Sequence, residues 1–578
     1  MKNLLKSICI FAVAATSVAC MDLYPKDQMS DVDVWGNAQN TQLFANQFYG
    51  ALRGFHAGNY RSVVQDGPHS DKRSDLIATP KVNDYSAGIN QIPATDGNYT
   101  DLYSRIYRTN LLLANVSATD DKSPMAQPIG EAYFFRAYLH FELVQLYGDV
   151  ILVQTAMDVN KPQITAQRDN RLVVVNAIIE DLKAAANYLP ETPSEEGRVC
   201  KATAWAMLSR VALYEGSWQK FHVGNGSNTT ESVALFKEAS AAAEKVMTSG
   251  QYQLFYNADL GPRDSYRYMF ILEDAAQCNP ANLNKSANTE YILAKRYNTP
   301  LKYIEYNITH GMLNHGDNMV TAKMADMYRC QDGLPISKSP KFKGYATATS
   351  EFENRDNRMN ATLMMHGQKH WDNDGKWRIT WDEQDEADGN CKVSNNRSNS
   401  GYANYKWCTE RQLTDAQESY DFPVIRYAEV LLNYAEAKYE EKDEISDADL
   451  DLSLNLVRAR TNPEMTKLSN QLVSANGLSM REEIRAERTV ELFEEGFRID
   501  DLKRWKTAEV EMPMNQEGIM YTGTWFGQQW TDMARPLSES GRILMWDGRV
   551  WEQKHYLYPL PSDQTQLNPN LGQNPGWE

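Results

Sequence analysis

Apolar residues recur at helical spacing through the first part of the chain, up to about residue 250. In residues 131–147 the apolar positions fall close to one helical face, and Gly148 is placed to end the helix. Alanines between residues 201 and 214 allow a neighbouring helix to pack closely. We expect antiparallel pairs that stack as degenerate tetratricopeptide-like repeats. The predicted helices cover residues 35–54, 98–116, 131–147, 172–188, 201–214 and 231–248.

The pattern changes between residues 255 and 420, where short apolar stretches alternate with Asn, Asp, Gly and Tyr. This region is suited to building a ligand site. Helical spacing returns over residues 423–440, with Pro423 in the first turn, and over residues 448–460 and 479–494. Four prolines after residue 558 predict an extended tail over residues 546–577 that wraps the body. The fold class is therefore mainly α: a helical-pair scaffold over residues 20–250, then a loop-rich, minor-β region within residues 251–578.

The first residues have the features of a secretion signal. Lys2 and Lys6 precede an apolar run over residues 8–19, and Cys20 follows small residues. As a helix this run would rise about 18 Å, short of the roughly 30 Å hydrocarbon core. We predict a lipoprotein signal peptide over residues 1–19, with acylation of Cys20 as the anchor. The alternative is an ordinary signal peptide with an incidental cysteine.

Composition and charge narrow the possible partners. The chain is 42% hydrophobic and has no second apolar stretch long enough to span a membrane. A formal net charge of −17, with no concentrated basic patch, argues against nucleic acid as a ligand. Five cysteines follow Cys20, so at least one stays free. A disulfide between Cys391 and Cys408 is a minor possibility.

Several local sequences, in order along the chain, resemble the SusD/RagB family. In the first half these are Glu131 to Tyr138, Leu146 to Val150 and the stretch over residues 201–214. In the second half they are Met324 to Tyr328, Asp332 to Ile336, Glu353 to Arg358, Arg426 to Ala437, Glu487 to Trp505, and the tail from Leu557 to Gly576. Each match alone is weak. Together with the lipobox they span most of the mature chain.

The resemblance implies a binding protein rather than an enzyme. Members of that family sit as lids on SusC-like TonB-dependent transporters in the outer membrane and capture glycans or, occasionally, peptides. The implied location is the outer membrane, lipid-anchored and surface-exposed. The charged motif residues have structural explanations from their helical spacing: we expect Arg426 to pair with Glu429, and Glu487 with Arg498 and Asp501.

Sugar recognition needs flat apolar faces beside polar groups that satisfy hydroxyls. For each candidate aromatic the alternative is packing in the core or contact with the transporter. The candidate glycan-binding residues fall in three clusters: Trp371, Trp377, Arg378, Trp381, Tyr402 and Tyr405; Asp66, Asp71 and Tyr85; and Tyr297.

Metal and catalytic motifs are weak, so we predict no metal and no cofactor. His366 and His370 have the spacing of a zinc pair but lack the intervening Glu of an HExxH motif. The sequence from Asp372 to Gly375 resembles part of a calcium-binding loop, but the residues at the first and last ligand positions of such a loop are not calcium ligands here. Two alternatives to glycan capture stay open: a peptide-binding member of the same architecture, and a surface glycoside hydrolase, whose paired carboxylates are defined only in space.

Overall fold

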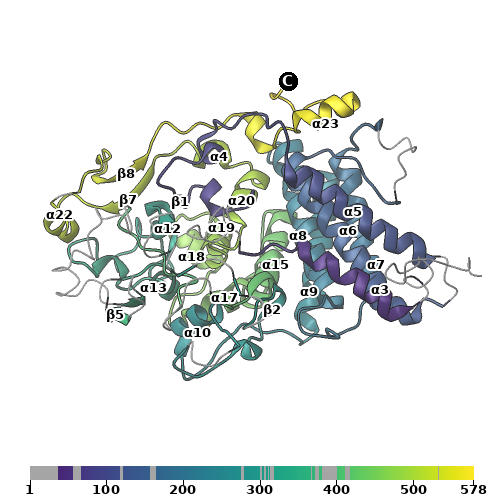
Figure 1. Ribbon diagram of the computed structural model, residues 1–578. Coiled ribbons are helices and arrows are strands. Elements are labelled where there is room, and N and C mark those ends of the chain that lie inside the picture. Colours follow the sequence, from purple (N-terminus) through teal and green to yellow (C-terminus); the bar gives the residue numbers. More distant parts are fainter. Residues whose placement is uncertain are drawn as a thin grey trace, which may run out of the picture.

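Two regions of different construction make up the protein. Figure 1 shows long helices on the right and short strands and helices on the left. The structure is a computed structural model, and it describes residues 35, 37–55, 67–117, 121–156, 165–274, 279–299, 303–304, 308–309, 312, 318–365, 368–371, 377–379, 400–409, 417–531 and 533–578. The predicted signal peptide and Cys20 lie outside these residues.

The helical region follows the predicted pattern. Each long helix packs on the next along the chain, as neighbour-on-neighbour burial requires. The short α3 is followed by a 3-10 turn, η1 (Asn46–Ala51), so the predicted helix over residues 35–54 is broken. The bounds are α3 (Ala38–Ala45), α5 (Gly97–Ser117), α6 (Ala126–Tyr147), α7 (Arg171–Tyr188), α8 (Lys201–Trp218) and α9 (Thr230–Thr248).

Helix α6 is buried on almost all sides rather than on one face. It contacts α3, η1, α5 and α7, so even its charged residues lie inside the protein. Gly148 ends the helix with a φ of 74°, a conformation that residues with a side chain rarely adopt. The long apolar run of α6 therefore makes it the centre of the scaffold.

The second half is built from short elements and two-stranded sheets. The strands pair as β1–β3, β2–β6, β4–β5 and β7–β8, all antiparallel. The strand bounds are β1 (Ile77–Ala78), β2 (Tyr291–Lys295), β3 (Met319–Val320), β4 (Lys369–Trp371), β5 (Trp377–Ile379), β6 (Phe422–Arg426), β7 (Gln516–Met520) and β8 (Arg542–Trp546). The helices are α4 (Asp84–Ala87), α10 (Gly261–Met269), α12 (Ala322–Met327), α13 (Asn357–Thr362), α15 (Tyr427–Lys442), α16 (Asp447–Asp451), α17 (Leu454–Thr461), α18 (Asn470–Ala475), α19 (Met480–Glu491), α20 (Arg498–Arg504), α21 (Ala508–Glu511), α22 (Trp525–Gln529) and α23 (Ser562–Leu567).

Two predicted helix boundaries in this half were wrong. Pro423 lies in β6 opposite Ala294 of β2, not in a helix, and α15 begins only at Tyr427. A proline lacks an N–H donor, and a two-stranded sheet tolerates it because each strand has a free edge. The helix predicted over residues 448–460 is divided into α16 and α17 around Ser453.

The two halves share one helical array. Helix α15 of the second half packs on both α8 and α9. The C-terminal tail returns across the helical region, where the Asn574 side-chain amide donates to the carbonyl oxygens of Tyr147 (3.0 Å) and Tyr558 (2.7 Å). The predicted wrapping of the tail is therefore confirmed, although α23 interrupts its extended course.

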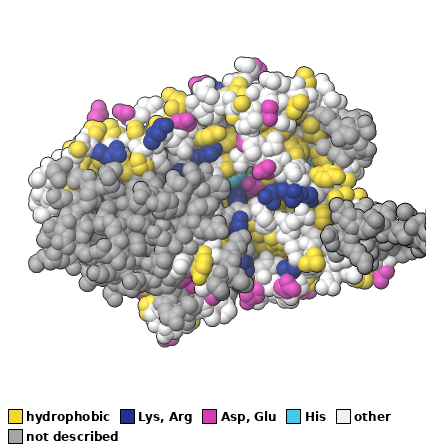
Figure 2. All heavy atoms as spheres, viewed as in Figure 1, with side chains coloured by type: hydrophobic (Ala, Val, Ile, Leu, Met, Phe, Trp, Pro, Cys, Tyr) yellow, Lys and Arg dark blue, Asp and Glu magenta, His cyan; other side chains and the backbone are white. Residues whose placement is uncertain are grey.

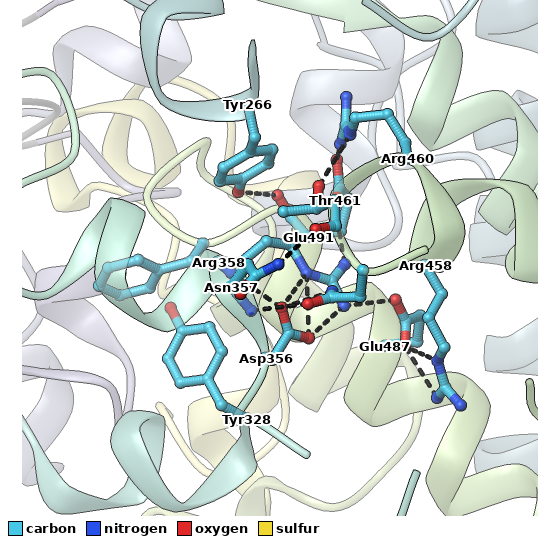
Figure 3. A network of polar contacts seen from close by, with 12 residues as sticks. Tyr266, Tyr328, Asp356, Asn357, Arg358, Arg458, Arg460, Thr461, Glu487 and Glu491 are labelled. Atoms are coloured by element: carbon cyan, nitrogen blue, oxygen red, sulfur yellow. Dashed lines mark hydrogen bonds and ion pairs between the residues drawn. The ribbon is translucent and has the colours of Figure 1, made fainter. Parts of the chain in front are cut away.

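A buried network of ion pairs lies at the centre of the second half (Figure 3). The Arg358 guanidinium contacts Asp356 and Glu487 at 2.6 Å and Glu491 at 2.8 Å, and Arg358 is 1% exposed. Arg426 joins the network because it also contacts Glu491. Charges this deep are tolerated only when each carboxylate has a cationic partner.

The prediction that these motif residues form structural ion pairs is confirmed, but the partners were wrong. Arg426 pairs with Glu290, Glu491 and Glu495, while Glu429 pairs with Arg210 of α8. Glu487 pairs with Arg358 and Arg458, Arg498 with Asp75, and Asp501 with Arg488 and Arg504. Helical spacing describes neighbours on one helix, whereas most of these pairs join separate elements.

Three of the five cysteines that follow Cys20 lie in the described part of the chain. Cys200, Cys330 and Cys408 are buried free thiols, and Cys391 lies outside the described residues. Within the described part of the chain, no helix combines the length and the apolar character needed to cross a bilayer.

Candidate functional site

A cleft of about 300 Å³ lies where the helical region meets the second half. Residues 50–55 and 67–69, the first turns of α5, two residues of α6 and Lys295 of β2 line this cleft, which we call the front cleft. Figure 2 shows Lys or Arg, Asp or Glu and His side chains gathered in the middle of one face of the molecule. The volume is at the lower end of the range for small-ligand pockets, roughly 300–1,000 Å³.

The polar wall of the front cleft comes from α5. Asn98, Asp101 and Arg105 are three and four residues apart, so they share one helical face. Within the described residues, neither the Asp101 carboxylate nor the Arg105 guanidinium has a hydrogen bond or ion pair. An acceptor and a planar donor are therefore available to a ligand at the same wall.

The floor of the front cleft contains a network of paired charges. His69 lies between two carboxylates, with Nδ1 2.6 Å from Asp500 and Nε2 3.0 Å from Glu142. Arg53 also contacts Glu142, at 2.8 Å. Burial alone would raise the pKa of Glu142, but Arg53 and His69 lower it to about 2. Burial and Arg53 oppose protonation of His69, and Asp500 and Glu142 outweigh them, so the pKa of His69 is raised.

An aromatic cluster supports the cleft beneath Phe55. The Phe55 ring meets the edges or faces of Tyr297, Trp407, Tyr420 and Phe422 at centroid distances of 5.1–5.8 Å. Gly54, next to it, has no room for a side chain, because a Cβ atom there would lie 2.4 Å from Cδ of Lys295. Phe55 is 5% exposed, so the cluster anchors the segment that lines the cleft and leaves no ring face open to it.

The family models place this architecture among known proteins. Residues 277–577, more than half of the chain, match the model described as the SusD family. The protein belongs to the SusD family. Residues 12–213 of this SusD-family protein also match a model described as starch-binding and associating with the outer membrane.

Curated relatives match over part of their length. A SusD-like protein of Formosa agariphila is 31% identical over 119 residues, which are 20% of this chain and 24% of the relative. Another SusD-like protein of the same organism is 22% identical over 271 residues, 44% of this chain and 46% of the relative. A SusD-like protein of Bacteroides ovatus is 25% identical over 36% of this chain and 38% of its own. The matched part of the chain therefore spans less than half of the length of each of these relatives.

Solved structures share the fold over nearly the whole chain. A SusD-like carbohydrate-binding protein of Bacteroides fragilis is 22% identical with a TM-score of 0.72, covering 93% of this chain and 99% of its own. A SusD homologue of Bacteroides thetaiotaomicron is 19% identical with a TM-score of 0.61, and the match covers 95% of this chain and 98% of the homologue. These likenesses confirm the predicted mainly helical SusD-like fold.

Four of the predicted sugar-binding residues of this SusD-family protein are buried and offer no free surface. Tyr402 is 1% exposed, and its hydroxyl donates to Glu351 at 2.7 Å. Tyr405 is 3% exposed, with the Arg267 guanidinium 3.6 Å above its ring, and Tyr297 supports Phe55. Asp71 is also buried and accepts the Glu494 backbone N–H at 2.7 Å. Because all four side chains are buried, we reassign them from sugar binding to packing in the interior.

Tyr85 is half-buried and also engaged. Its ring stacks on Tyr558 at 4.9 Å, and the Arg73 guanidinium lies 3.8 Å from the ring centroid. Sequence proximity placed it near Asp66, but the contacts with Tyr558 anchor it to the tail instead. Asp66 lies outside the described residues.

The tryptophan-rich stretch forms a hairpin of β4 and β5. Its backbone register places Trp371 opposite Trp377, and Arg378 opposite His370. In Figure 1 this hairpin lies near the left edge, apart from the α5 end that lines the front cleft. Trp381 lies outside the described residues. The assignment of Trp371, Trp377, Arg378 and Trp381 to sugar binding stays a prediction.

Sequence reasoning missed the polar wall. Asp101 and Arg105 belong to a helix, where isolated charges usually face solvent. The spacing of Asn98, Asp101 and Arg105 was a usable signal, but only the approach of β2 and of residues 67–69 turns that helix face into a cleft wall. Among the described residues, no group of three or more metal-ligating side chains is found.

Proposed function

We propose that this protein captures oligosaccharides at the outer membrane and delivers them to a SusC-like TonB-dependent transporter, with acylated Cys20 as its anchor. The front cleft carries the proposal: among the described residues Asp101 and Arg105 have no partner, and the half-buried Ala51, Pro68 and Leu102 add apolar surface to the same lining. Membership of the SusD family and the description of the N-terminal family model support it.

Sugar rings fit the chemistry of this cleft. Their C–H faces pack on apolar surface, and their hydroxyls both donate and accept hydrogen bonds. Burial of roughly 100 Å² of apolar surface contributes about 2.5 kcal/mol before ordering costs. Two or three such contacts, about 5–7.5 kcal/mol together, correspond to binding in the micromolar to millimolar range, which suits a protein that must release its cargo.

Affinity electrophoresis against plant, microbial and host polysaccharides tests the capture step. We expect one polysaccharide to retard the protein, and the double substitution Asp101→Ala/Arg105→Ala to restore most of the free mobility. The matched control is Asp259→Ala/Arg263→Ala, which removes the same charges far along the sequence and outside the cleft lining. Retardation that is unchanged in the cleft variant would exclude the front cleft as the binding site.

The same panel distinguishes the alternative functions. Binding of oligopeptides with indifference to every sugar would favour the peptide-binding function. Reducing ends that accumulate with time would favour a glycoside hydrolase. The anchor is tested separately with Cys20→Ala, which we expect to release the protein from the envelope and to abolish incorporation of labelled fatty acid.

A further inference from the structure

A second cavity, of about 360 Å³, lies between the two halves of the protein. It is lined by residues 192–198 between α7 and α8, by Gln251 and Tyr252 after α9, and by residues on and before β2. We call it the junction cavity. None of its lining residues lines the front cleft.

Strand β2 separates the two cavities. Ala294, together with Arg296 just past the strand end, lines the junction cavity, whereas Lys295 between them lines the front cleft. Successive side chains of an extended strand point to opposite faces. At residues 294–296 the two cavities therefore lie on opposite faces of the strand, whereas Tyr291 and Ile292, before the register shift, both line the junction cavity.

The charges around the junction cavity are balanced. Lys285 lies 2.9 Å from Asp421, and Arg296 lies 2.8 Å from Glu196 and 3.3 Å from Asp421. Arg198 is paired outside the cavity with Glu131 and Glu195. Because each cation already has a carboxylate partner, the wall favours a neutral ligand over an ionic one.

The rest of the lining combines apolar surface with an unused acceptor. Tyr252 and Tyr291 are half-buried, and Met269, Leu272 and Ile292 are buried behind them. The Gln251 side-chain oxygen is buried and, among the described residues, accepts no hydrogen bond. A buried acceptor without a donor costs free energy, and because Gln251 is half-buried and lines the cavity, rotation of its side chain toward a ligand hydroxyl would recover that free energy.

We propose that the junction cavity is a second carbohydrate site, which takes one or two neutral sugar units. Tyrosine rings and apolar side chains would meet the C–H faces, and Gln251 would accept from a hydroxyl. The inference rests on the proposed function, because it assigns the same class of ligand. It differs in adding a site whose lining shares no residue with the front cleft.

Saturation-transfer NMR tests the site with glucose, galactose, mannose, xylose, N-acetylglucosamine, maltose and cellobiose as probes. The background is the front-cleft variant Asp101→Ala/Arg105→Ala, so that signal from the first site is removed. In that background we expect at least one probe to show saturation transfer, and Ser286→Trp and Gln251→Ala each to reduce it at least fivefold. Ser286 is an exposed residue at the cavity rim, and Ser227→Trp, on an exposed loop elsewhere, is the matched control.

The outcomes separate this inference from the proposed function. If no probe binds the background variant, or if either cavity variant leaves the signal unchanged, the second site is overturned, while retardation of the wild-type protein by a polysaccharide still supports capture at the front cleft. If the wild-type protein neither is retarded by a polysaccharide nor binds a probe, both proposals fail. Far-ultraviolet circular dichroism of each variant verifies that it is folded.

Discussion

The helical region and the second half are stabilised in different ways. Helices α6 to α9 bury continuous apolar surface, as in Leu143, Leu208 and Phe236, each fully buried. The second half, with short strands and turns, has at its centre Arg358 and Arg426 among buried carboxylates. Both regions also contain the other kind of contact, because the second half buries apolar clusters and the helical region buries pairs such as Arg136 with Asp181 at 2.6 Å. The difference is that the second half joins several arginines and carboxylates into one network of charge-assisted hydrogen bonds.

The largest effect is expected from breaking the ion-pair network. Arg358→Ala leaves Asp356, Glu487 and Glu491 without their shared cation, so we expect a loss of about 3–5 kcal/mol in the free energy of unfolding. Urea unfolding monitored by tryptophan fluorescence measures it. A loss below about 1 kcal/mol would show that the carboxylates find other partners and that the network is not essential to this half.

A comparable truncation in the helical region tests the other side of the comparison. Leu208→Ala in α8 creates a cavity in the apolar core, and we expect a loss of about 2–4 kcal/mol. The same urea experiment applies. Raising the salt concentration should leave this loss unchanged, because no charge is removed; a strong salt dependence would contradict apolar packing as the cause.

The buried acids near the network should make stability depend on pH. Burial, reinforced by the nearby charge of Asp71, raises the pKa of Glu494 from 4.5 to about 8. A raised pKa means that the protonated carboxyl contributes stability that is complete below pH 4.5 and is lost as the pH rises through 8. Glu494→Gln keeps a neutral side chain at every pH, so we expect it to be more stable than the wild type by about 2 kcal/mol at pH 6, where the carboxyl is ionised in the unfolded chain and still protonated in the folded protein.

The control for this prediction is the pH profile itself. The advantage of Glu494→Gln should vanish near pH 4, where both side chains are neutral, and should grow between pH 4.5 and 8. Thermal unfolding at several pH values measures the difference. A constant difference across that range would mean that the substitution acts through shape rather than charge.

The smallest effect is expected at the surface. Lys467 and Asp451 form an ion pair at 3.1 Å, but their side chains are 65% and 49% exposed. Solvent screening leaves such pairs little net value, so Lys467→Ala should change the free energy of unfolding by less than about 0.5 kcal/mol. A loss comparable to that of Arg358→Ala would remove the distinction between buried and exposed pairs.

The sequence predicted the helical region better than the candidate site. Helices over residues 98–116 and 172–188 were placed within one or two residues of α5 and α7, because a period of 3.6 is a local property of the chain. The strand containing Pro423 was mistaken for a helix, since its pairing partner β2 lies more than a hundred residues earlier. Tyr402 and Tyr405 were expected at a sugar site, but composition could not distinguish an exposed aromatic ring from a buried one.

By itself, the sequence determined the helical scaffold and the set of family motifs. These depend on periodicity and on short local patterns. Only the tertiary structure decided which carboxylate each arginine meets, and that α5, residues 67–69 and β2 enclose the front cleft. The physical reason is that ion pairs and clefts depend on distances between segments far apart in the chain, whereas a helix depends on neighbours three and four residues away.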